Sequence, residues 1–60
     1  MTARDQVLAT IKDIGSVTPS EVSERTALSL AEVQAALDDL VGAGEVVEGE
    51  RAYWVPEPDE

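Results

Sequence analysis

The fold of this chain is decided by residues 18–32, which read TPSEVSERTALSLAE. Two helix-start signatures lie eleven residues apart in this stretch, one beginning at Thr18 and the other at Ser29. In each, a hydroxyl residue is followed three positions later by a glutamate, Glu21 or Glu32, which is the pattern of a capping box. The first also carries a proline at the first helical position. The spacing therefore leaves room for a short helix, a tight turn and the start of a second helix.

Hydrophobic spacing predicts three helices in all. The first covers residues 3–14, with Thr2 as its N-cap and Gly15 directly after its end. The second covers residues 19–26, and the third runs from residue 30 to about residue 41, where the glycines of a Gly-Ala-Gly segment are expected to end it. The first and third helices each carry one apolar stripe, formed by Val7, Leu8, Ile11 and Ile14 and by Val33, Ala36, Leu37, Leu40 and Val41.

Residues 45–55 change from helical to strand character. Two runs rich in β-branched and aromatic residues, 46–47 and 53–55, flank a turn centred on Gly49. This arrangement predicts a β-hairpin. Residues 16–17 are interpreted as a connector between the first two helices.

Alternation along the second strand of the hairpin places Trp54 opposite to Tyr53 and Val55. The size of the indole favours its burial, and simple filling of the core is the preferred interpretation. If Trp54 points outward instead, it forms an exposed apolar patch with Val47, which would suit a dimer or a partner protein.

The length and residue types limit the class of protein. Sixty residues make one small domain, predicted here at 1–55 with an acidic, disordered tail at 56–60. The chain has no cysteine and no histidine, so disulfides, thiolate metal sites and imidazole chemistry are excluded. The sequence also lacks a long apolar run and a signal-peptide pattern, which leads us to expect a soluble, cytoplasmic protein. We predict no enzyme activity, no metal and no cofactor.

The charge balance is strongly acidic. Thirteen Asp and Glu residues against four Lys and Arg residues give a net charge of −9, and Lys12 is the single lysine. Scarce lysine, many carboxylates and small apolar side chains are typical of salt-in halophiles, where concentrated KCl screens self-repulsion. The alternative is an ordinary acidic interaction protein. Lysine depletion favours the halophilic interpretation.

From residue 17 to residue 55 the chain resembles the winged helix-turn-helix superfamily of transcription regulators, particularly compact archaeal and MarR-type modules. The resemblance is carried by residues 18–29, by Val33 and residues 37–40, and by residues 44–46, which are similar to the family's exit from the recognition helix into the wing. It implies a mainly α fold of three helices with a two-stranded wing. The family's Tyr-x-Val pattern would place Tyr53 and Val55 inward. Ala27 departs from the family, which often has glycine in this turn.

The resemblance also implies a non-enzymatic regulator that binds duplex DNA. The reading helix, residues 29–39, would enter the major groove. Gln34 is suited to adenine and Glu32 to the amino group of cytosine, while Arg25 and Arg51 would contact phosphates. The matching nucleic-acid positions are Arg25, Ser29, Ala31, Glu32, Gln34, Ala35, Asp38 and Arg51.

The charge of the third helix argues against DNA, because Glu32, Asp38 and Asp39 would repel phosphates and the helix carries no Lys or Arg. Each basic residue of the chain is also expected to form an ion pair with a nearby carboxylate. A second hypothesis is therefore an acidic interaction module that keeps the fold. It would present the third helix, or Val47 and Trp54, to a basic protein or to a second copy of the chain.

Overall fold

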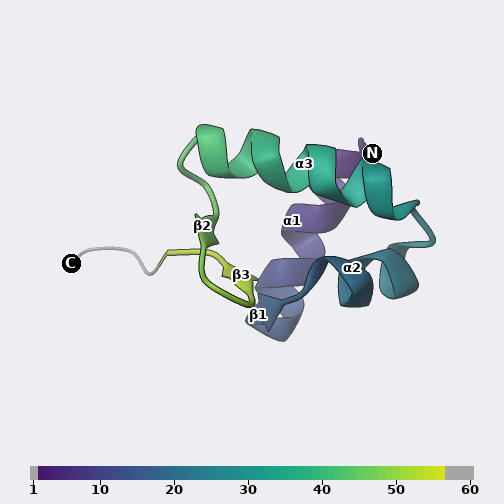
Figure 1. Ribbon diagram of the computed structural model, residues 1–60, viewed down its shortest axis with the longest axis horizontal. Coiled ribbons are helices and arrows are strands. Elements are labelled where there is room, and N and C mark those ends of the chain that lie inside the picture. The colour runs from purple at the N-terminus through teal and green to yellow at the C-terminus, as the bar shows by residue number, and fades with distance from the viewer. Residues whose placement is uncertain (1, 57–60) are drawn as a thin grey trace.

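The computed structural model describes residues 2–56 as three helices and a small antiparallel sheet (Figure 1). The elements in chain order are α1 (Ala3–Ile14), β1 (Ser16–Val17), α2 (Pro19–Thr26), α3 (Leu30–Gly42), β2 (Val47–Glu48) and β3 (Tyr53–Trp54). The predicted helices and hairpin are confirmed. Of the predicted tail at 56–60, all but its first residue lies outside the described residues. Within residues 2–56, no helix is both long enough and apolar enough to cross a bilayer.

The helix starts follow the capping signals, with one difference. At α3 the capping box is complete: Ser29 Oγ accepts from the backbone amide of Glu32, and the Glu32 carboxylate accepts from the Ser29 amide. At α2 the amide of Glu21 donates to Thr18 Oγ1 at 3.2 Å, but the return bond from Glu21 is absent. The prediction of a reciprocal box at Thr18 was therefore wrong. That start uses the proline at the first helical position instead.

The sheet has three strands, in the order β1-β3-β2. Ser16 pairs with Trp54 and Val17 with Tyr53, while Val47 and Glu48 pair with the same two β3 residues from the other side. The interpretation of residues 16–17 as a connector was therefore wrong. A two-residue strand has too little alternation to reveal itself, and its partner lies near the other end of the chain.

Two glycines provide the left-handed backbone at helix ends. Gly15 follows α1 with a φ of 111°, and Gly44 follows α3 with a φ of 78°. Gly42 does not end the helix as predicted, because it is the last helical residue and its φ is not positive. Ala27 takes the same left-handed role after α2, with a φ of 61°.

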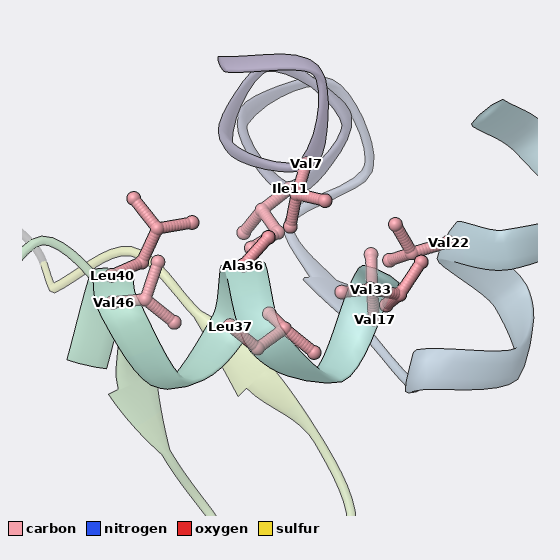
Figure 2. Packing of buried hydrophobic residues seen from close by; sticks show 9 residues of the cluster. All are labelled: Val7, Ile11, Val17, Val22, Val33, Ala36, Leu37, Leu40 and Val46. Carbon is pink, nitrogen blue, oxygen red and sulfur yellow. The ribbon is translucent and has the colours of Figure 1, made fainter. Parts of the chain in front are cut away.

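The core lies between α1 and α3 and is closed by α2 and the sheet (Figure 2). Val17 and Val22, which flank the start of α2, are both fully enclosed, as expected for residues that staple a helix entry. The apolar stripes predicted for the first and third helices meet in this interior. The buried residues are Val7, Ile11, Val17, Val22, Val33, Ala36, Leu37, Leu40 and Val46.

Candidate nucleic-acid interface

The first half of α3 presents a row of exposed side chains opposite the core. The core is contacted by the positions at helical spacing from Val33 to Leu40, so the intervening positions face outward. Ser29 caps the helix at its start. The exposed positions of this face are Ala31, Glu32, Gln34, Ala35 and Asp38, and all of them were predicted from the sequence.

The carboxylate of Glu32 is already engaged at the helix start. Its Oε1 accepts from the Ser29 amide at 3.3 Å and from the Ser29 hydroxyl at 3.0 Å. Glu32 therefore serves first as a cap, and a base contact would compete with those two bonds. Leu30 lies beside it with 49% of its surface exposed, a feature that sequence analysis missed. Leu30 stands three residues before Val33 and seven before Leu37, so helical spacing alone would have placed it on the apolar stripe and gave no signal of its exposure.

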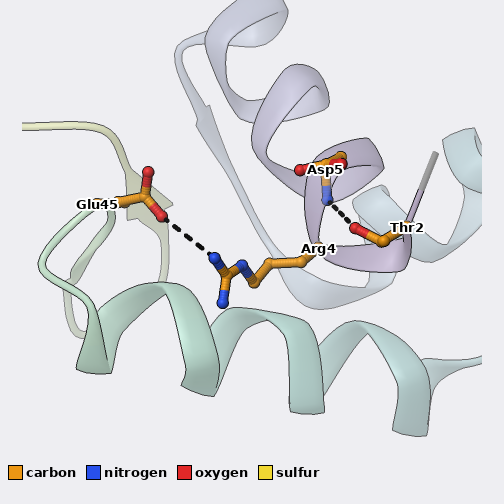
Figure 3. Close-up of polar contacts among 4 residues, drawn as sticks. All are labelled: Thr2, Arg4, Asp5 and Glu45. Atoms are coloured by element: carbon orange, nitrogen blue, oxygen red, sulfur yellow. Dashed lines mark hydrogen bonds and ion pairs between the residues drawn. The ribbon is translucent and has the colours of Figure 1, made fainter.

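Arg4 is the basic residue that the structure places next to α3. Its guanidinium extends across the helix towards Glu45, with Nη2 4.0 Å from Oε2 (Figure 3). About half of each side chain is exposed, so the ion pair is weak. Sequence analysis did not assign Arg4 to the site. Its spacing from Val7, Leu8 and Ile11 could have shown that it continues the inward face of α1.

A shallow depression of about 330 Å³ lies between the start of α1 and the side of α3. Small residues form much of its lining, and Arg4, Glu32 and Asp39 supply its charged groups. Arg4 thus shares a concavity with the outward positions of α3. The full lining is Thr2, Ala3, Arg4, Glu32, Ala35, Ala36 and Asp39.

The other two predicted phosphate contacts come from different elements. Arg25 is exposed in the last turn of α2, and Arg51 is exposed in the loop between β2 and β3. That loop runs away from α3 and lies beside β1 (Figure 1), in agreement with the pairing of Val17 with Tyr53. Among residues 2–56 only Arg4 forms an ion pair, so the expected pairing of Lys12, Arg25 and Arg51 with carboxylates is not found there.

The outer face of the sheet carries an exposed apolar pair. Val47 lies opposite Trp54 in the sheet register, and their side chains are 36% and 38% exposed. Burial of Trp54 as core filling was therefore the wrong interpretation. Tyr53 and Val55 pack against the core instead, as the family pattern implied.

Tyr53 lies on the other face of the wing, near two carboxylates. Its hydroxyl donates to Glu48 Oε2 at a long 3.5 Å. Burial raises the pKa of the Tyr53 hydroxyl, and the negative charges of Glu48 and Asp38 raise it further. Tyr53 is therefore neutral at physiological pH and serves as a packing residue with a polar tip. Within residues 2–56, no three carboxylates gather in a way that could hold a metal ion.

No family model and no curated protein matches this chain. A solution structure of a DNA binding protein from Sulfolobus islandicus resembles it with a TM-score of 0.86 and 23% sequence identity. The match covers 93% of this chain and 95% of the other. Since the likeness extends over nearly the whole of both chains, the two share a fold. The three helices, the small sheet and this match are consistent with a winged-helix architecture.

Proposed function

We propose that this protein is a non-enzymatic winged-helix module that binds duplex DNA, as transcription regulators of this fold do. The observation that carries the proposal is the likeness along almost the entire chain to a structure described as a DNA binding protein. The exposed first half of α3 supports it, because a helix needs a free outward face to enter the major groove.

The side chains of α3 suit close approach to base edges. Ala31 and Ala35 are small and can contact thymine methyl groups, while the Gln34 amide is suited to the donor and acceptor pair of adenine. Glu32 secures the helix start through Ser29. Arg25 and Arg51 would add phosphate contacts from α2 and the wing.

Charge makes this interface unusual among DNA-binding surfaces. The chain has a net charge of −9, and α3 carries no basic residue. Repulsion from phosphates is strongest in dilute buffer, and salt screens both that repulsion and any attraction. We therefore expect modest affinity with a shallow salt dependence, in which base contacts and shape contribute more than counterion release.

The test is an NMR titration of the isotope-labelled chain with a pool of duplexes of random central sequence, in dilute buffer and in molar KCl. We expect the amide chemical shifts of residues 29–39 and of the residues around Arg51 to change when DNA is added. Gln34→Ala should weaken binding, and Arg25→Ala should weaken it more than Lys12→Ala, which removes the same charge from α1. Unchanged shifts across 29–39 at both salt concentrations would contradict DNA binding.

A second candidate is an interaction module for a basic protein. It is favoured by the exposed pair Val47 and Trp54 together with the acidic outer face of α3. A probe peptide with alternating lysine and leucine should then change the fluorescence of Trp54, and Trp54→Ala should weaken its binding. A homodimer through the same pair is opposed by the charge of −9 on each copy. Sedimentation at low salt would show whether the chain is a homodimer or a monomer, and a monomer would leave the Val47 and Trp54 pair free for a basic protein.

A further inference from the structure

Arg4 occupies a position from which it can serve the interface of α3 directly. It shares the depression with Glu32, Ala35 and Asp39 of α3, and its guanidinium lies over that helix (Figure 3). α3 itself has no cation, so Arg4 is the positive charge that the fold brings to this helix. This placement is tertiary, since α1 and α3 are far apart in sequence.

The present partner of Arg4 is held loosely. The Arg4 Nη2 to Glu45 Oε2 distance is 4.0 Å, beyond the range of a strong charge-assisted hydrogen bond. Both side chains are about half exposed, so water competes for each of them. A guanidinium that is so weakly paired can exchange its carboxylate for another anion at little cost in free energy. A phosphate group can accept two parallel hydrogen bonds from it.

We propose that Arg4 binds a backbone phosphate of the DNA beside α3, and that Glu45 competes with that phosphate for the guanidinium. The proposal rests on the DNA-binding function proposed above and adds a residue to its interface. Glu45 then acts as an internal substitute for phosphate that lowers the affinity of the free protein. Of the other charges lining the depression, Glu32 is engaged at the helix cap, and Asp39 remains to repel the phosphate.

The experiment measures binding of a fluorescently labelled random-sequence duplex by anisotropy, over a series of KCl concentrations. The chains are wild type, Arg4→Ala, Glu45→Gln and the double variant. Lys12→Ala and Asp13→Asn are the matched controls, because they make the same charge changes at the far end of α1. All four substituted positions are exposed, and circular dichroism checks that every variant is folded.

We expect Arg4→Ala to weaken binding about tenfold, as for the loss of one charge-assisted hydrogen bond, and to reduce the salt slope by about one. Lys12→Ala should have a smaller effect. Glu45→Gln should tighten binding by up to about fivefold, the fold-change that corresponds to an exposed ion pair. Asp13→Asn should tighten it less, and the gain from Glu45→Gln should vanish once Arg4 is absent.

Two results would overturn the inference while leaving DNA binding intact. One is equal loss of affinity in Arg4→Ala and Lys12→Ala. The other is a gain from Glu45→Gln that persists in the double variant, because the gain would then come from net charge alone. If no chain binds DNA, Glu45→Gln included, both this inference and the proposed function are overturned.

Discussion

At the scale of single residues, Ala27 is the position where the backbone is under strain. Its φ of 61° is left-handed, a conformation that a residue with a Cβ adopts at a cost of about 1–2 kcal/mol. The strain is tolerated because Leu28 must turn back to the core while Ser29 starts the next helix. The Ser23 hydroxyl, which donates to the Leu28 carbonyl at 2.7 Å, holds the turn in place.

We therefore predict that Ala27→Gly stabilises the protein by about 1 kcal/mol, because glycine adopts this φ without steric penalty. Urea unfolding followed by circular dichroism measures the change. Ala43→Gly is the control, since Ala43 has an ordinary φ of −83° and should lose stability on the same substitution. Equal effects of the two variants would show that the left-handed turn stores no strain.

At the scale of elements, the wing is organised by the packing of Trp54 over its turn. A Cβ placed on Gly49 would overlap the distal ring atoms of the Trp54 side chain. Gly49 has no positive φ, so the wing requires a glycine here because there is no room for a side chain, and not because of backbone conformation. The outward indole is thereby supported on one side while part of it stays exposed to solvent.

Gly49→Ala should therefore displace the partly exposed Trp54 ring and change its fluorescence in the folded state, with a loss of stability of no more than about 0.5 kcal/mol because the ring can move into solvent. Thermal unfolding and emission spectra measure the two effects. Gly42→Ala is the matched control, because a Cβ there meets no atom within 4 Å and alanine favours the helix. A Trp54 emission spectrum that is the same in Gly49→Ala as in Gly42→Ala would mean that Trp54 does not pack over the turn.

At the scale of the whole molecule, a large net charge lowers the stability that a small core provides. Thirteen carboxylates repel one another across 60 residues, and the one ion pair within residues 2–56 is exposed. A domain of this size buries little surface, so its net free energy of unfolding is small. Self-repulsion is small beside the conformational entropy lost on folding, but it is a substantial fraction of the small net free energy of unfolding in dilute buffer.

Screening by KCl should raise the melting temperature by about 5 °C or more between dilute buffer and molar salt, which corresponds to roughly 1 kcal/mol for a domain of this length. The combined Asp38→Asn and Asp39→Asn variant, which removes two carboxylates from α3, should show a weaker dependence. Calorimetry measures both. A melting temperature that is flat with KCl would remove the halophilic interpretation of the composition.

The helices are predictable from the amino-acid sequence, because their signals are local. The cap at Ser29, the proline at the start of α2 and the apolar spacing of α1 and α3 all act within a few residues. The exposed positions of α3 followed from the same periodicity. These features made the fold and half of the candidate site predictable.

The third strand, the outward orientation of Trp54 and the position of Arg4 beside α3 follow from long-range packing. Each depends on contact between segments that are far apart in the sequence: β1 with β3, and the start of α1 with α3. A pairing of two residues leaves no periodic trace, and helical spacing does not say which neighbour a side chain meets. Such contacts exist only once the core has brought the segments together.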